Sequence, residues 1–406
     1  AQAAARQMAE LKGKEGWLFT LDIPSYLPVM MYADNRALRE EFYTAYTTRA
    51  SEQGNPEFDN TPVMEEILSL RQEMAQLLGF SSYAEFSLAS KMAPDVATVH
   101  QFLIDLAEHA RKPAEQEIAE LKAMAAEDGI ADLQPWDTGY YSEKLKMRQF
   151  NLSQEALKPY FPAPKILQGL FSIVSRLYGI NIVEREAPVW HPDARYFELE
   201  EQGSVLGGFY FDLYARSGKR GGAWMDDVRS RWQRPDNGQL QTPVAHMVCN
   251  FADGVDGQPA LLTHDDVITL FHESGHALHH LLTQVTEKDV SGINGVEWDA
   301  VELPSQFMEN FCWEWDVLRH MTAHVKTGEP LPRALFDKMV AAKNFQAGMQ
   351  TLRQVEFALF DMLLHTQAAP SGDYLALLQQ VRDEVAVLPT TPYNRSTNTF
   401  SHIFAG

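Results

Sequence analysis

The chain is poor in cysteine and contains no long apolar run. Cys249 and Cys312 are its only cysteines among 406 residues, too few for a disulfide framework at this length. We therefore expect a reducing, cytoplasmic compartment. Charges interrupt every apolar stretch before it reaches the eighteen or so residues that span a bilayer, and the N-terminus lacks the apolar middle of a secretory signal. A membrane is not an expected partner.

Basic residues are also scarce relative to acidic ones. The chain has 34 Lys and Arg against 55 Asp and Glu, which gives a formal net charge of -21. This charge repels a phosphate backbone, so nucleic acid is not an expected partner either. The sequence has no internal repeat, so a regular helical array is not indicated. It also lacks a starting Met, and we expect a processed or excised chain.

The spacing of apolar residues predicts mostly helices with one small sheet. Residues 1–190 show three- and four-residue spacing and form a mostly helical region. A second region, 191–406, opens with strand patterns at Arg195 to Leu199 and Val205 to Tyr214, which read as a hairpin about Gly203. A further strand is expected at 243–251, followed by helices over 264–284, 301–326, 332–366 and 374–387. We predict a mainly α fold with a small antiparallel sheet, and no clear linker separates the two regions.

The helix predicted after the sheet contains the pattern His-Glu-x-x-His. Thr263 and Asp266 have the spacing of a capping box at its start, so the pattern falls in mid-helix. Four-residue spacing stacks His272 and His276 on one face, close enough to bind one ion. Glu273 beside them is placed to act as a general base on a metal-held water. The alternative is a His-rich structural helix, and the preceding sheet and the following acid-rich segment disfavour it.

A catalytic zinc requires a third protein ligand and an open position. His280 shares the face of His272 but lies about 12 Å along the helix axis from it, too far to bind the same ion. His279 points elsewhere, and we expect both to be supporting, substrate-facing or structural residues.

Downstream carboxylates are better candidates for the third ligand. Pro304 is tolerated in the first turn of a helix, which would put Glu302 near the start of the next helix and favours it. The full set of candidates, which spacing alone leaves open, is Glu297, Asp299, Glu302 and Glu309.

These residues carry a resemblance to a known family. The segments FHESGHALH (271–279) and DAVELPSQ (299–306), with Glu309, resemble the signature of the thimet oligopeptidase family of zinc metallopeptidases. The likeness is nearest to its bacterial members and runs through the chain. It includes GWLFTLDIPSYLPVM, YFDLYARSGKRGGAWM, PVAHMVCNF and the final FSHIFAG.

The resemblance implies a zincin-like metallopeptidase fold with one zinc ion per chain. It implies metal ligation by His272, His276 and Glu302, activation of water by Glu273, and short unstructured peptides as substrates. A sheet edge beside the motif helix would hold the substrate backbone. One departure is Ser274, where Phe is usual. Family members continue at both ends, so we expect this chain to be part of a longer peptidase.

The expected reaction is hydrolysis of internal bonds in short peptides. His402 and His279 are candidate donors to the oxyanion, and Asp299 and Glu309 are candidates for orienting the imidazoles. The glycine-flanked cations between 216 and 220 suggest either an anion-binding loop or, more in keeping with the pattern, a structural turn.

Three other functions compete with this one. They are a non-catalytic, zinc-stabilised peptide-binding protein, a catalytically impaired fragment, and a peptidase that acts only at chain ends.

Overall fold

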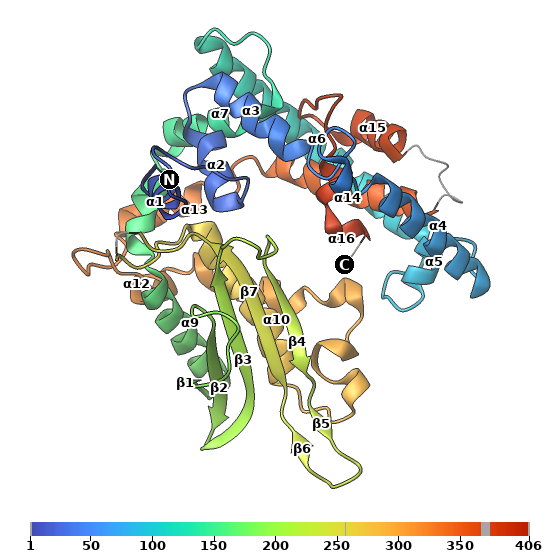
Figure 1. The fold of residues 1–406 in the computed structure, drawn as a ribbon, viewed down its shortest axis with the longest axis vertical. Coiled ribbons are helices and arrows are strands. Elements are labelled where there is room, and N and C mark those ends of the chain that lie inside the picture. The colour runs from blue at the N-terminus through green and yellow to red at the C-terminus, as the bar shows by residue number, and fades with distance from the viewer. Residues whose placement is uncertain (1, 256, 367–373, 405–406) are drawn as a thin grey trace. The chain divides into compact units, whose positions relative to one another are not determined.

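The computed structural model describes residues 2–255, 257–366 and 374–404 (Figure 1). The chain forms two compact units that are interleaved in sequence. The sheet unit comprises Ala1–Ser25 and Phe150–Ala342, and the helical unit comprises Tyr26–Gln149 and Lys343–Gly406. The expected division of the chain into two regions near residue 190 stays a prediction. None of the described helices combines the length and apolar character needed to cross a membrane.

The sheet unit is built on a five-stranded sheet with the order β1-β2-β3-β7-β4. Its strands in chain order are β1 (Asn181–Arg185), β2 (Arg195–Glu201), β3 (Ser204–Tyr214), β4 (Trp224–Arg229) and β7 (Val244–Phe251), and β5 (Trp232–Gln233) pairs separately with β6 (Leu240–Gln241). The predicted hairpin is confirmed as β2 and β3. Its turn residues Gln202 and Gly203 both have positive φ, as a two-residue turn between twisted strands requires.

The prediction of a wholly antiparallel sheet was wrong. Strand β7 pairs in parallel with β3 and antiparallel with β4, so the sheet is mixed. The chain leaves β3, forms β4, and returns to insert β7 between them. Alternation along a strand reports which face is buried and carries no information about the direction of its neighbour. Strands β1 and β4 were not predicted from the sequence. Strand β4 is an exposed edge strand, and its polar residues lie on both faces, so it lacks the alternation that predicts a strand.

Two long helices of the sheet unit, α9 (Ala163–Tyr178) and α10 (His264–Leu281), cover one face of this sheet (Figure 1). Buried side chains from the sheet, from α9 and from α10 pack together in a single apolar core. The other helices of this unit are α1 (Gln2–Leu11), α8 (Gln154–Leu157), η2 (Lys158–Tyr160), η3 (Lys288–Val290), η4 (Gly292–Gly295), η5 (Trp298–Ala300), α11 (Leu303–Glu309), η6 (Asn310–Trp313), α12 (Trp315–Met321) and α13 (Arg333–Ala341).

Two of the predicted helices are each divided. The segment 301–326 holds α11, η6 and α12, because Glu314 is extended and ends the helical path before α12. The segment 332–366 holds α13 and α14 (Ala347–Thr366), which are separated at Gln346, a residue with φ of 58°. Apolar spacing continues through both breaks, so periodicity alone did not reveal them.

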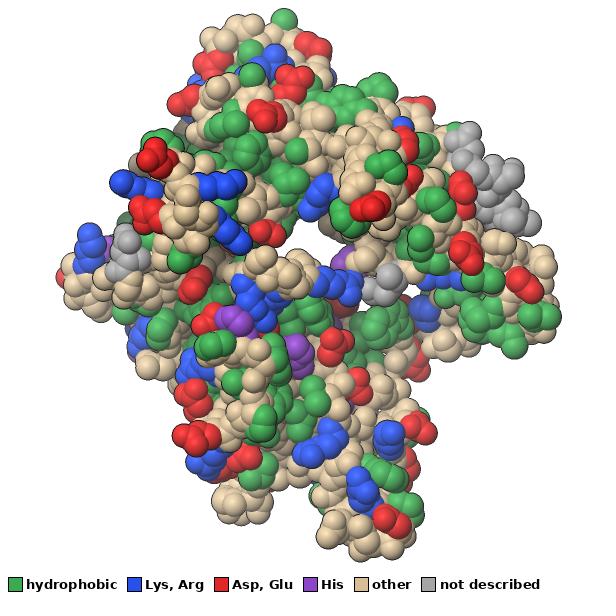
Figure 2. Space-filling view, in the orientation of Figure 1, with side chains coloured by type: hydrophobic (Ala, Val, Ile, Leu, Met, Phe, Trp, Pro, Cys, Tyr) green, Lys and Arg blue, Asp and Glu red, His purple; other side chains and the backbone are tan. Residues whose placement is uncertain are grey.

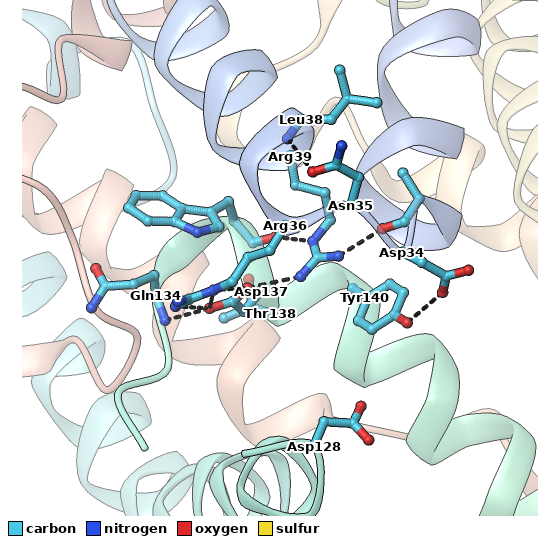
Figure 3. Close-up of polar contacts among 12 residues, drawn as sticks. Asp34, Asn35, Arg36, Leu38, Arg39, Asp128, Gln134, Asp137, Thr138 and Tyr140 are labelled. Carbon is cyan, nitrogen blue, oxygen red and sulfur yellow. Dashed lines mark hydrogen bonds and ion pairs between the residues drawn. The ribbon is translucent and has the colours of Figure 1, made fainter. Parts of the chain in front are cut away.

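The helical unit packs α6 (Val96–Glu127) against α14 around a second apolar core. Its other helices are α2 (Ile23–Tyr32, which begins in the sheet unit's segment), α3 (Arg36–Thr47), η1 (Pro56–Phe58), α4 (Thr61–Leu77), α5 (Tyr83–Leu88), α7 (Pro135–Phe150), α15 (Tyr374–Val385), η7 (Ser396–Thr399) and α16 (Ser401–Phe404). A buried ion pair joins α3 to α7. Figure 3 shows Asp137 accepting hydrogen bonds from Arg36 and Arg39, with Arg39 Nη2 2.9 Å from Asp137 Oδ1.

Candidate metal centre

The helix α10 begins as predicted and positions the His-Glu-x-x-His motif at its middle. The Thr263 hydroxyl accepts from the Asp266 amide at 3.0 Å, and the Asp266 carboxylate accepts from the Thr263 amide at 2.8 Å, which confirms the capping box. Val267, Leu270 and Phe271 are buried in the core below. Because the start of the helix is capped and one face is buried, the motif residues are presented in a fixed orientation.

His272, His276 and Glu302 converge in space, and we call them the His–His–Glu cluster. His272 Nε2 lies 3.0 Å and His276 Nε2 3.2 Å from the same Glu302 oxygen, Oε2. The two imidazole rings are nearly perpendicular, with centroids 4.9 Å apart. One potential ligand atom from each of the three residues lies within 4.8 Å of the others.

The cluster fits a zinc ion. Two atoms that are each about 2.1 Å from a tetrahedral ion lie about 3.4 Å apart, close to the separations between the Glu302 oxygen and the two imidazole nitrogens. Two imidazole nitrogens and one carboxylate oxygen form a donor set that zinc accepts. Burial lowers the pKa of His276, which favours the neutral imidazole that a metal requires.

Glu309 contacts His272 through the ring nitrogen that does not face Glu302. The imidazole Nδ1 lies 2.7 Å from Glu309 Oε1, and with a metal at the cluster Nδ1 would carry the proton and donate it to this carboxylate. The Nε2 lone pair of His272 is then directed to the cluster. Glu309 therefore lies where the predicted orienting role requires it, while the role itself stays a prediction.

Glu273 is buried beside the cluster and does not belong to it. Its side chain is on α10 with only 5% of the residue exposed. Burial raises the pKa of Glu273 to about 7, with Glu302 adding to the rise and His272 opposing it. A carboxyl group with this pKa can take up and release a proton near neutral pH.

The remaining predicted site residues are not members of the His–His–Glu cluster. Asp299 is exposed in η5 and lies outside the group of converging ligand atoms found among the described residues. His279 is half-buried and lines a pocket on the side of α10 that faces Phe307. His402 is exposed in the helical unit, next to the Phe400 ring. Their roles remain predictions.

His280 has a structural position, one of the options expected for it. It is fully buried, with Nε2 3.0 Å from the carbonyl oxygen of Arg229 at the end of β4. The Ile293 amide approaches its other ring nitrogen. His280 thus links the end of α10 to the edge strand of the sheet.

The cationic loop after β3 also has a structural arrangement. Lys219 Nζ donates to Asp212 Oδ1 at 2.9 Å and to the carbonyl oxygens of Tyr214 and Cys249. Arg216 donates to both oxygens of the same Asp212 carboxylate. Protein acceptors thus bind Arg216 and Lys219, and the third cation, Arg220, lies 5.6 Å from the centre of the Trp224 ring. These contacts favour the structural turn over an anion-binding loop.

The structure shows the side-chain contacts of two serines near the motif, Ser274 and Ser305. Ser274 lines an apolar cavity of about 20 Å³ under α10, and its hydroxyl donates to the Leu270 carbonyl. Ser305, which the sequence reasoning did not single out, has its Oγ 2.7 Å from Glu302 Oε2. The available signal was its position three residues after Glu302, within reach in the first turn of a helix.

A His-Glu-x-x-His helix packed on a small sheet, with an acid from the following helix, is typical of metallopeptidases. Residues 29–406 match the model of Peptidase family M3, and the chain belongs to this family. It is 56% identical to oligopeptidase A of Salmonella typhimurium and of Escherichia coli, in each case over 100% of this chain and 61% of the relative. Identity to the dipeptidyl carboxypeptidase of E. coli is 34%, over 100% of this chain and 60% of that protein.

The chain therefore spans about 61% of the length of the oligopeptidases A that it matches. The family match confirms the resemblance predicted from the motifs, and with it a mainly α, zincin-like fold.

Proposed function

We propose that this chain carries the metal centre of a zinc-dependent peptidase that hydrolyses internal bonds of short peptides. His272, His276 and Glu302 would hold one zinc ion, and Glu273 would act as general base. The observation that carries the proposal is the convergence of two Nε2 atoms and one carboxylate oxygen, with a buried carboxyl beside them that is not part of the ligand set.

A zinc ion bound at the cluster would supply Lewis acidity, polarising the carbonyl of the bond to be cleaved and acidifying a water. The protein's own residues would then handle protons and orientation. The Glu273 carboxylate would accept a proton from the attacking water and pass it to the leaving amine. Glu309 would keep the Nδ1 proton of His272 in place throughout.

The edge strand β4 offers a place for the substrate backbone. In the part of the chain that the structure describes, β4 pairs with β7 alone, and α10 packs against both strands. An extended peptide could add to its open edge through main-chain hydrogen bonds, which select for unfolded segments. The link from His280 to the Arg229 carbonyl would hold this strand at a fixed position beside α10.

Substrate class and compartment are inferred from relatives. The names oligopeptidase A and, for a 45% identical Arabidopsis thaliana relative, probable cytosolic oligopeptidase A support short peptides as substrates and a cytoplasmic location. Cys249 and Cys312 are free thiols, as a reducing compartment favours.

The test uses a defined peptide of about twelve residues, with fragments identified by mass spectrometry. The wild-type chain should cleave internally, stop with a chelator and resume with added zinc. Glu273→Gln should lower the rate by about 10²- to 10⁴-fold and still bind one zinc ion. The control is Glu287→Gln, which makes the same chemical change at the exposed residue just before η3 and should cleave like wild type.

Other outcomes separate the competing functions. Zinc binding by a wild-type chain that does not cleave would favour the peptide-binding protein or the impaired fragment. Release of dipeptides alone would favour the chain-end activity that the name of the 34% identical relative describes. Cleavage that persists in chelator would refute the zinc mechanism.

A further inference from the structure

The helices α10 and α11 approach each other unusually closely at Gly275, which lies between Glu273 and His276. A Cβ atom added to Gly275 would lie 2.4 Å from the Pro304 carbonyl oxygen and 2.5 Å from the Ser305 Cα. Ordinary van der Waals contacts require about 3.5 Å. The atoms in the way belong to the backbone and cannot rotate aside, so any larger residue would push α11 outward by about 1 Å.

This close approach determines where Glu302 lies. Glu302 is the N-cap residue of α11, two and three residues before the backbone that contacts Gly275. Any outward movement of Pro304 and Ser305 therefore moves Glu302 with them. Since the Glu302 oxygen is 3.0 Å and 3.2 Å from the two imidazole nitrogens, a shift of this size would disrupt the cluster.

Ser305 holds the end of the same side chain. Its residue is fully buried, and its Oγ lies 2.7 Å from Glu302 Oε2 and 3.0 Å from the Glu302 carbonyl oxygen. The Glu302 side chain is 50% exposed, and an exposed glutamate samples several rotamers in solution. The buried hydroxyl stabilises the one rotamer in which Oε2 faces the two histidines.

We propose that Gly275 and Ser305 are positioning residues for the metal centre. Gly275 sets the distance between α10 and α11, and Ser305 fixes the carboxylate of Glu302 in its ligating orientation. The inference rests on the proposed function, because it takes the His–His–Glu cluster as a metal site. Neither residue would contact the ion or the substrate. Both act through Glu302.

The first experiment compares two serines. The affinity of the full chain for zinc is measured by competition with a chromophoric chelator. Ser305→Ala should weaken zinc binding by about 10- to 100-fold, the usual effect of losing a group that orients a ligand. The matched control is Ser274→Ala, which removes another buried hydroxyl, one that donates to the Leu270 carbonyl on α10. It should leave zinc affinity unchanged within about threefold.

The second experiment compares two glycines in the sheet unit. At Gly169 an added Cβ would lie 2.1 Å from the Met321 Cβ, where α9 meets α12. Gly275→Ala and Gly169→Ala should both lower the urea midpoint of unfolding, because both overpack a helix contact. Only Gly275→Ala should also weaken zinc binding, by about tenfold or more.

A third measurement asks whether Ser305 acts through Glu302. In a Glu302→Ala background, Ser305→Ala should cause no further loss of zinc affinity, because its target is already gone. This test stands even if Gly275→Ala fails to fold. A loss of equal size in both backgrounds would overturn the positioning role, since the hydroxyl would then act by another route.

The outcomes keep the two proposals apart. A wild-type chain that binds no zinc would refute the proposed function. A wild-type chain that binds zinc while Ser305→Ala and Gly275→Ala bind it equally well would leave that function standing and refute the inference.

Discussion

Burial of Glu273 should make the metal-free protein less stable at neutral pH than at acidic pH, and Glu273→Gln should remove this effect. The ordinary pKa of a glutamate is 4.5, and burial raises that of Glu273 to about 7. The folded chain therefore holds the proton more tightly than the unfolded chain. As the pH rises from 4.5 to 7, the unfolded side chain ionises first, and the free energy of unfolding falls.

The magnitude follows from these two pKa values. Each pH unit between them corresponds to about 1.4 kcal/mol, so the loss amounts to about 3 kcal/mol, complete above pH 7. Glutamine has nearly the same shape and does not titrate. Glu273→Gln should gain stability relative to wild type as the pH rises, by about 3 kcal/mol between pH 4.5 and pH 8.

The assay is urea unfolding with a chelator present throughout, at pH 4.5, 6 and 8. Tryptophan fluorescence reports on the sheet unit, which contains Glu273, because seven of the eight tryptophans belong to it and only Trp136 lies outside it. The exposed variant Glu287→Gln is the control, and because it retains Glu273, its stability should change with pH as that of wild type does. A difference between Glu273→Gln and wild type that is the same at all three pH values would refute the reasoning.

Three further predictions concern packing and buried charge. Lys219→Met should lower the free energy of unfolding of the sheet unit by about 3 kcal/mol in urea titrations, because it leaves the buried Asp212 without one of its partners. Hydrogen bonds outweigh burial and hold the pKa of Asp212 below its ordinary 3.8. The contribution of the ionised Asp212 to the free energy of unfolding is therefore lost as the pH falls below that value. The unfolding midpoint of Asp212→Asn should change less with acid than that of wild type. Gly348→Ala should destabilise the helical unit by about 1–3 kcal/mol, as measured by calorimetry, because the added Cβ would lie 2.6 Å from a backbone nitrogen of α6. Gly139→Ala is the control and should not destabilise the unit, because its added Cβ would lie 3.6 Å from the nearest atom.

Local signals were sufficient to predict the motif helix and the hairpin before it. The capping residues Thr263 and Asp266 act within one turn, and the hairpin turn at Gly203 involves adjacent residues. In both cases the atoms that form the structure are close in sequence, so their spacing carries the information. The type and position of both elements were therefore predicted correctly.

The sequence favours Glu302 as the third ligand, but spacing alone does not exclude the other carboxylates. Glu302 reaches the histidines because Gly275 of α10 allows the backbone of Pro304 in α11 to approach closely. That approach joins residues about thirty positions apart, and no periodic pattern encodes it. The parallel pairing of β3 with β7 has the same origin, because it depends on where a returning strand inserts.

The buried ion pair of the helical unit offers a last prediction. The Arg39 side chain is 2% exposed, and its guanidinium donates to Asp137 and lies 4.1 Å from the centre of the Tyr140 ring (Figure 3). Arg39→Met removes the charge and keeps much of the apolar volume. It should destabilise the unit by about 3–5 kcal/mol, because Asp137 is left buried with only Arg36 as a cationic partner.

The double variant Arg39→Met with Asp137→Leu tests this cause. If the cost comes from an uncompensated buried charge, removing the second charge should restore a substantial part of the lost stability, since apolar pairs of similar volume can replace buried ion pairs. Recovery would be incomplete, because Asp137 also accepts from the Gln134 amide. The exposed pair of Arg148 with Glu127 provides the comparison, and Arg148→Met should change stability by less than about 1 kcal/mol. Hydrogen exchange followed by mass spectrometry over α3 and α7 would locate the change, and a double variant less stable than Arg39→Met would show that shape, not charge, determines the loss.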